Sequence, residues 1–161
     1  MKKLLIILSI VAGVIFIAGS FGGGGRTDAK LYFADSSMLR LIPSDFSVRT
    51  KNKDKAAKAV IAALEKGKEN NNKILRLMPN VKKGLSVRVK GKTAYVNMSG
   101  EFVRLHSDAR QHEFLTIYSI VNSLTSIDGI INVKFTIDNK IQKDFKGFCD
   151  MRETFIPDYY I

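Results

Sequence analysis

The sequence predicts an α+β fold: a two-layer sandwich with two helices on one face of a mixed or antiparallel sheet, preceded by an N-terminal hydrophobic helix. Two patterns carry this prediction. Several short segments alternate apolar and polar residues at period two, which is typical of strands with one buried face. Two longer segments repeat apolar residues every three to four positions, as amphipathic helices do. Because the alternation leaves the sheet one polar face, we expect both helices to cover the other face.

The N-terminal segment is expected to place the rest of the chain outside a membrane. Lys2 and Lys3 precede an uncharged run over residues 4–21 that is dominated by leucine, isoleucine and valine. As a helix, this run would span about 27 Å, close to the roughly 30 Å of a hydrocarbon core. Basic residues stay on the cytoplasmic side, so the chain after this run is predicted to face outward.

The residues that end this run leave the mode of attachment open. Small side chains in Ala18-Gly19-Ser20 suit signal peptidase, so residues 1–21 are either a cleaved signal peptide or a retained transmembrane anchor. The stretch Ile17-Ala18-Gly19-Ser20 also looks like a bacterial lipobox, but Ser20 has no thiol to carry the lipid. We therefore expect the protein at the extracytoplasmic face of the cell membrane, or secreted if the segment is cleaved.

The remaining chain divides into a short linker and one domain. Residues 22–29 begin with four glycines and are expected to form a flexible tether. Residues 30–161 are enough for a single hydrophobic core. Cys149 is the only cysteine of the chain, which excludes an internal disulfide and any multi-cysteine metal site.

The first half of this domain predicts two extended segments and a helix. Residues 30–35 form the first strand, and residues 38–48 a second extended stretch with a turn at Pro43-Ser44-Asp45. Over residues 54–66 the apolar side chains recur at helical spacing, and Gly67 is well placed to end that helix.

The second half predicts a hairpin, a helix and a further strand. Residues 85–98 alternate at period two on both sides of Lys90-Gly91-Lys92, which indicates a β-hairpin. A second helix is expected from Asp108, as its N-cap, to Leu124. A half-buried strand follows over residues 131–137, and we expect the aromatic tail over residues 145–161 to pack back on the domain.

Several segments resemble one known family, the GerM domain of bacterial sporulation and germination proteins. The most specific is Ile117-Tyr118-Ser119-Ile120-Val121-Asn122-Ser123-Leu124-Thr125, and the match covers roughly residues 30–158. Departures are Lys68 in place of a common proline, Asn139 in place of a common glycine and Cys149 in place of an aliphatic residue. Further matching segments are 31–35, 85–89, 94–99, 133–138 and 147–150.

The resemblance implies an envelope-associated module, often lipid-anchored and related in shape to the ring-building motifs of sporulation assemblies. Members of the family are thought to act by assembly rather than by chemistry, and no catalytic residues are established for them. A serine at position 20 puts the lipid anchor in doubt for this chain. A transmembrane helix would serve instead.

Candidate catalytic and metal-binding residues are few. His106, His112 and Glu113 would make at most a weak acid–base cluster, and solvated surface histidines are the favoured interpretation. Cys149 has no nucleophile motif around it, so a small buried hydrophobe is expected there. The stretch Asp138-Asn139-Lys140 is expected to be a turn rather than a calcium loop. Asn97-Met98-Ser99 fits a glycosylation sequon, a triplet that often arises by chance. We predict no catalytic residue, no metal site and no cofactor.

The second helix carries a group of polar residues, Tyr118, Ser119, Asn122 and Thr125. Ser119 and Asn122 are three positions apart and are able to hydrogen-bond neighbouring backbone. The favoured interpretation is structural, with Asn122 helping to fix the helix against the sheet; a role in ligand binding is the alternative.

Positive charge is concentrated in one part of the chain. The formal net charge is +11, and residues 51–92 contain 13 Lys or Arg against 3 Asp or Glu. A solvated surface explains many such clusters, but this density also favours an anionic partner. Candidate binding residues are Lys82, Lys83, Arg88, Lys90 and Lys92.

Two functions follow for the outer domain. The first is a non-enzymatic binding and assembly module of the cell envelope, whose partners are other envelope proteins or further copies of itself. The alternative is a receptor-like domain that binds anionic wall polymer or lipid headgroups through residues 51–92. Outward topology disfavours nucleic acid as a partner. A hydrolase that uses His106 or His112 is the third and weakest hypothesis.

Overall fold

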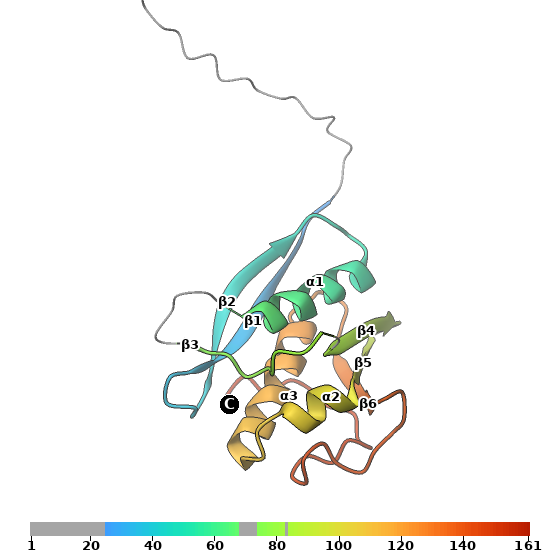
Figure 1. Cartoon of the computed structure of the whole chain (residues 1–161). Coiled ribbons are helices and arrows are strands. Elements are labelled where there is room, and N and C mark those ends of the chain that lie inside the picture. The colour runs from blue at the N-terminus through green and yellow to red at the C-terminus, as the bar shows by residue number, and fades with distance from the viewer. Residues whose placement is uncertain (1–24, 68–73, 83) are drawn as a thin grey trace, which may run out of the picture.

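The computed structural model describes residues 25–67, 74–82 and 84–161, and these residues form three helices and six strands (Figure 1). The hydrophobic helix expected over residues 4–21, the lipobox-like Ile17–Ser20 and Lys83 lie outside the described residues. The elements, in chain order, are β1 (Thr27–Asp35), β2 (Leu41–Val48), α1 (Lys53–Lys66), β3 (Ile74–Leu75), β4 (Leu85–Lys90), β5 (Thr93–Met98), α2 (Gly100–Leu105), α3 (Arg110–Thr125) and β6 (Asn132–Ile137).

The α+β class is confirmed, but the strands form two sheets where the sequence predicted one. The first has the order β2-β1-β3 and is antiparallel. The second has the order β4-β5-β6, with β4 antiparallel and β6 parallel to the central strand. β1 begins at Thr27, so the last residues of the expected tether belong to the first sheet.

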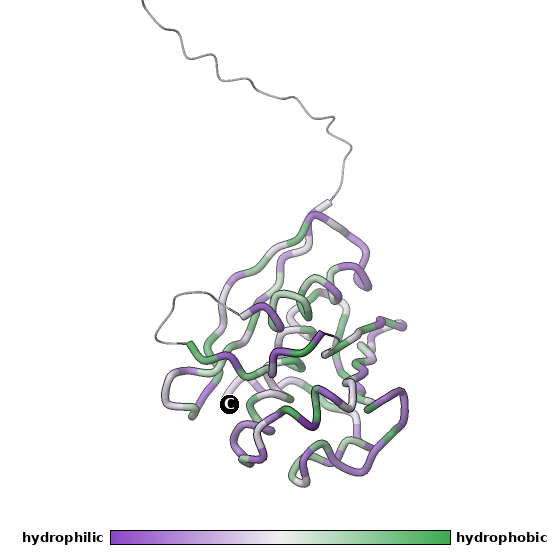
Figure 2. The backbone as a smooth tube through the Cα atoms, in the orientation of Figure 1, coloured by the Kyte–Doolittle hydropathy of each residue, from purple (hydrophilic) through white to green (hydrophobic). Residues whose placement is uncertain are grey.

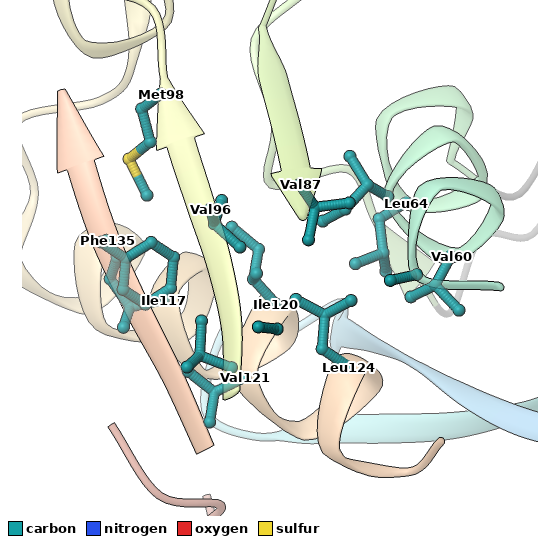
Figure 3. Packing of buried hydrophobic residues seen from close by; sticks show 14 of the residues in the cluster. Val60, Leu64, Val87, Val96, Met98, Ile117, Ile120, Val121, Leu124 and Phe135 are labelled. Atoms are coloured by element: carbon teal, nitrogen blue, oxygen red, sulfur yellow. The ribbon is translucent and has the colours of Figure 1, made fainter. Parts of the chain in front are cut away.

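Helix α3 occupies the middle of the molecule. Its Ile117, Ile120, Val121 and Leu124 are buried against the second sheet and α1, as Figure 3 shows. The predicted apolar face is only part of what is buried, because Thr116, Ser119, Asn122 and Ser123 are also inside. Phe114, three positions before Ile117 on the same helix, is 38% exposed. Figure 2 shows hydrophobic residues gathered along the inner parts of the elements and hydrophilic ones along most outer loops.

Two local predictions are wrong, and one helix was not expected. Pro43 lies inside β2 and pairs with Tyr32 instead of making a turn; it is tolerated because β2 is an edge strand. Helix α2 was not expected, and it is capped by the Ser99 hydroxyl, which accepts a hydrogen bond from the Phe102 N–H. Asp108 does not cap α3, whose N-cap is Ala109 without a side-chain bond.

The two predicted turns are present. Gly91 has a φ of 60° between β4 and β5, a conformation that favours glycine. Asp138 and Asn139 also have positive φ, at 48° and 62°, and they form a tight turn in which Ile137 and Lys140 exchange backbone hydrogen bonds. This geometry confirms the expected turn after β6.

The C-terminal tail packs back on the domain, as predicted. Phe155 exchanges two backbone hydrogen bonds with Val133 on the outer edge of β6. Phe145 and Met151 are buried in the core. The Ile161 carbonyl accepts a hydrogen bond from the Leu41 N–H at the start of β2.

Candidate functional site

Of the four described residues of the predicted basic site, Arg88, Lys90 and Lys92 lie near one another on β4 and its turn, whereas Lys82 lies apart. Lys82 precedes β4 and borders a hollow that also involves Glu65 and Asp138. Lys90 and Lys92 flank the turn at the other end of β4. Since β4 has six residues, its two ends are about 17 Å apart. Lys82 therefore lies at one end of β4, and Lys90 and Lys92 lie at the other end.

Arg88 belongs to the solvent-facing side of the second sheet. It pairs across the strands with Tyr95, which pairs in turn with Lys134, so an aromatic ring lies in register between two cations. Tyr95 is 43% exposed. A hollow of about 260 Å³ covers this row and reaches the neighbouring row of Ser86, Asn97 and Thr136. We call the three residues Arg88, Tyr95 and Lys134 the cationic row.

The inner edge of β1 is paired by the side chains of a helix. Ser123 Oγ accepts a hydrogen bond from the Tyr32 N–H at 2.9 Å, and Ser119 Oγ donates one to the Tyr32 carbonyl at 2.6 Å. Next along the chain, Ser126 Oγ accepts a hydrogen bond from the Lys30 N–H at 2.7 Å. Its own hydrogen is shared between the Ser123 carbonyl at 2.7 Å and the more distant Lys30 carbonyl at 3.2 Å. The three serines, here named the serine row, take the place of a neighbouring strand.

The free edge of β4 is covered in the same way by acidic residues of α1. Asp54 accepts a hydrogen bond from the Val89 N–H at 3.0 Å, and Glu65 accepts one from the Leu85 N–H at 2.8 Å. The ammonium of Lys58 beside Asp54 holds the pKa of that carboxyl below its usual value, whereas burial raises the pKa of Glu65. The serine row thus covers the inward-facing edge of β1 in the first sheet. Acidic side chains of α1 cover the inward-facing edge of β4 in the second sheet.

The outer edge of β2 is different. Because Leu41 N–H points outward to the Ile161 carbonyl, the alternation along an antiparallel strand also turns the backbone of Pro43, Asp45 and Ser47 outward. Pro43 has no N–H. In the described part of the chain, no hydrogen bond covers the outward N–H and C=O groups of Asp45 and Ser47. We call these groups the open β2 edge.

The polar residues singled out on α3 have structural roles. Asn122 accepts from the Asp158 N–H at 3.0 Å and donates to the Asp158 carbonyl at 2.6 Å, so it fixes the tail rather than the sheet. Thr125 Oγ1 returns to the Val121 carbonyl of its own helix. Ser123 and Ser126 were not among the residues singled out from the sequence. The signal that could have identified them is the spacing of positions 119, 123 and 126, which places the serine row on one side of a helix.

The two histidines lie close together, with ring centroids 6.0 Å apart, and Cys149 lies beside Glu113. The expectation of a solvated His106 is wrong: the ring is buried against Phe145, and Nε2 lies 2.8 Å from Thr116 Oγ1. Glu113 is fully buried and accepts from the Cys149 N–H at 2.7 Å. Burial, together with the nearby Glu113 carboxylate, raises the pKa of the Cys149 thiol to about 12. Cys149 is thus a buried thiol, as the sequence predicted.

Within residues 25–67, 74–82 and 84–161, no three His, Cys, Asp or Glu side chains are grouped so that they could share a metal ion. Among the same residues, no helix has the length and apolar character needed to cross a membrane.

Similar folds occur in solved structures of proteins from Clostridium perfringens and Bacillus subtilis. A candidate lipoprotein of Clostridium perfringens is 22% identical, with a TM-score of 0.59 over 82% of this chain and 88% of that one. The first GerMN domain of the sporulation protein GerM from Bacillus subtilis is 19% identical, with a TM-score of 0.57 over 77% and 92%. The tandem GerMN domains of the same protein give 21% identity and 0.57 over 75% and 42%. At these identities the likeness shows the fold alone.

The family is shown by the sequence itself. No curated protein matches the chain. The family model described as "Germane: Sporulation and spore germination" matches residues 30–143, which is well over half of the chain. This match confirms the GerM resemblance of the segments over residues 31–138. The chain therefore belongs to the Germane family of sporulation and spore germination domains.

Proposed function

We propose that this protein is a non-enzymatic assembly module of the bacterial cell envelope, tethered outside the cytoplasmic membrane, and that it binds a strand of a partner protein along the open β2 edge. Membership of a sporulation and germination family supports the envelope setting, and the fold shared with a candidate lipoprotein is consistent with it. The observation that carries the proposal is the contrast between β2 and the other long edges.

The edges of β1, β4 and β6 are each covered by other parts of the same chain. The serine row covers β1, Asp54 and Glu65 cover β4, and the tail covers β6 at Val133. On β2 the tail reaches only Leu41. Exposed strand edges are templates for strand addition, and natural proteins usually protect them. The contrast therefore favours β2 as a surface left open for a partner.

The neighbourhood of this edge suits a short, specific contact. A hollow of about 350 Å³ lies beside it, lined by Asp28, Asp45, Phe46 and Ser47 among others, and offers room for a partner side chain. Pro43 ends the available edge on one side. The four outward groups of Asp45 and Ser47 would contribute about 2–6 kcal/mol if all were bonded. A contact of this free energy is weak between two molecules free in solution. It becomes effective between copies held at one membrane, because their effective concentration is high.

Site-directed photocrosslinking tests the proposal. Because Cys149 is buried, Ser47→Cys provides the only reactive thiol of the described chain for a benzophenone label. The matched control is Ser86→Cys on the outer side of the second sheet. On membranes of the native cell, we expect the label at position 47 to capture a discrete partner or a second copy, and the label at position 86 to capture none.

A backbone variant tests the role of the open β2 edge itself. Ser47→Pro removes one outward N–H without touching the ladder to β1, so we expect capture from a label at Asp45→Cys to fall at least about 10-fold. Ser47→Ala keeps the N–H and should leave capture unchanged. Equal capture at positions 47 and 86, or full capture in Ser47→Pro with intact circular dichroism, would contradict the proposal.

The cationic row favours a second candidate function, binding of an anionic wall polymer. Arg88 and Lys134 lie on either side of the exposed Tyr95 ring, an arrangement that suits a sugar carrying phosphate or carboxylate groups. Binding of isolated wall polymer should weaken steeply with salt and be lost in Arg88→Glu/Lys134→Glu. If this double variant binds as the wild type does, the candidate is wrong.

A further inference from the structure

The chain enters the folded domain at an end that is rich in basic residues. Arg26 is the second described residue, and Gly25 lies against the Lys51 side chain. The Thr27 hydroxyl donates to the Thr50 carbonyl, which ties the start of β1 to the loop before α1. Figure 1 shows this loop and the first described residues together at the top of the domain, and Figure 2 shows the loop as hydrophilic.

Lys53 joins two further segments to this end. Its Nζ donates to the Gly91 carbonyl at 3.2 Å and to the Gly129 carbonyl at 3.4 Å. A hollow of about 470 Å³ lies between these segments and is lined by Arg26, Lys51, Lys53 and Asp128 among others. The β4–β5 turn, with Lys90 and Lys92 on either side of Gly91, therefore belongs to the same end of the molecule.

Basic side chains from three separate parts of the sequence thus lie at one end. Of these, Arg26 pairs with Asp28, and Lys53 holds the two carbonyls. The other four are exposed and have no side-chain partner within the described residues. The acidic residues that line this hollow are Asp28 and Asp128, and the nearby Asp54 is paired with Lys58, so positive charge is in excess. We define the juxtamembrane basic surface as Arg26, Arg49, Lys51, Lys53, Lys90 and Lys92.

We propose that the juxtamembrane basic surface binds the anionic headgroups of the bilayer to which the chain is tethered. Only Gly22 to Gly25 separate the apolar run from this surface, and four residues reach at most about 14 Å. The headgroup layer itself takes up about 5–7 Å of this reach. Electrostatic attraction decays over about 8 Å at physiological salt, so the surface lies within reach of the headgroups. This inference rests on the tethered placement proposed above.

The consequence is a fixed orientation of the domain. Val48, at the end of β2, pairs with Thr27 beside the basic surface, so the open β2 edge runs away from the same end. Headgroup contact therefore holds the edges of neighbouring molecules at one height above the bilayer, where they meet in the same orientation. Anionic wall polymer is the rival ligand, but the short tether presents this surface to the bilayer first.

Thiol accessibility in vesicles tests the inference on the full-length chain. Ile131→Cys reports on the basic end, because Ile131 is 54% exposed and its N–H donates to the Lys92 carbonyl. Ser36→Cys, exposed in the turn between β1 and β2, reports on a site away from it. Both are reacted with a polar maleimide on phosphatidylcholine vesicles with and without about one third phosphatidylglycerol.

We expect phosphatidylglycerol to slow labelling at position 131 by at least about 10-fold, because each basic residue strengthens headgroup contact about fivefold. Labelling at position 36 should not change, and 0.5 M salt, as roughly the level where screening is strong, should remove the protection. Lys51→Gln/Lys90→Gln/Lys92→Gln should also remove it. The matched control Arg104→Gln/Lys140→Gln/Lys143→Gln, with equal loss of charge elsewhere, should keep it.

Vesicle flotation separates failure of the tether from failure of this contact. A chain that does not float contradicts the proposed tethering, and the inference falls with it. A chain that floats but is labelled equally fast at position 131 on both lipids overturns the headgroup contact alone. Protection that arises only when poly(glycerol phosphate) is added would identify wall polymer as the ligand and would likewise overturn it.

Discussion

Replacing Ser123 by alanine should destabilise the domain more than any other single change in the serine row. The Ser123 hydroxyl is buried and accepts the Tyr32 N–H at 2.9 Å while it donates to the Ser119 carbonyl at 2.6 Å. Tyr32 is itself buried, so its N–H finds no replacement acceptor in the variant. A buried donor left without a partner costs about 1–3 kcal/mol.

Alanine partly offsets this cost through its higher helix propensity, by about 0.5 kcal/mol. The net loss expected for Ser123→Ala is therefore about 0.5–2.5 kcal/mol of unfolding free energy. Ser126→Ala is the internal control, because its bonds to Lys30 are solvent-exposed and water is able to replace the hydroxyl. We expect that variant to lie within about 0.5 kcal/mol of the wild type.

Urea unfolding of both variants measures the difference. At a slope of about 1.5 kcal/mol per molar urea, a loss of 1.5 kcal/mol lowers the midpoint by about 1 M. The amide of Tyr32 should also exchange with deuterium faster in Ser123→Ala. Equal midpoints for Ser123→Ala and Ser126→Ala, with an unchanged slope, would refute the idea that the serine row replaces a strand.

Three further outcomes follow from the same structure. Asn122→Ala removes both bonds to the Asp158 backbone, so the last residues should become sensitive to carboxypeptidase while the core stays folded; an uncut tail would count against this. Cys149, with its pKa raised to about 12, should resist thiol reagents at pH 8 and react fully in urea; rapid native labelling would contradict its burial. Burial lowers the pKa of His106, so the unfolded chain takes up a proton first as pH falls below about 6.5. Stability should therefore decline from there until the lower folded pKa is passed, and His106→Gln should flatten that decline in unfolding curves at pH 7.5 and 5; an equally steep decline in this variant would contradict the reasoning.

The elements with strong local signals could be predicted from the sequence. Alternation on both sides of Gly91 predicts the β4–β5 hairpin, because a glycine turn and a period-two pattern determine the structure locally. The division into two sheets could not be predicted in this way. It depends on Ser119, Ser123 and Ser126 of α3 covering an edge that another strand would otherwise occupy, and serines at helical spacing are common on exposed helices.

The central position of α3 could not be predicted from the sequence for the same reason. Buried Thr116, Ser119 and Ser123 make the helix look amphipathic, although hydrogen bonds to backbone or side chains satisfy each of them inside the protein. Helix α2, with six residues, is too short for a helical period to be recognised.

For the candidate binding residues, closeness in the sequence does not predict closeness in the folded domain. Lys82 and Lys90 are near in the sequence but lie at opposite ends of β4. Arg26 and Lys53 are far apart in the sequence but line one hollow, because β1 and α1 begin at the same end of the domain. The charge pattern along the chain singled out Lys90 and Lys92 of the juxtamembrane basic surface, but it could not group them with Arg26 or separate them from Lys82.

Hydrogen exchange at the amides of Asp45 and Ser47 tests the proposed assembly most directly. In the isolated full-length protein in neutral vesicles, both outward amides should exchange rapidly, since no acceptor within the described residues covers them. In the membranes of the native cell, or with the captured partner added, both should slow at least about 100-fold while the Ser86 amide stays as it was. Unchanged exchange at Asp45 and Ser47 in an assembly that is shown to have formed would contradict the account.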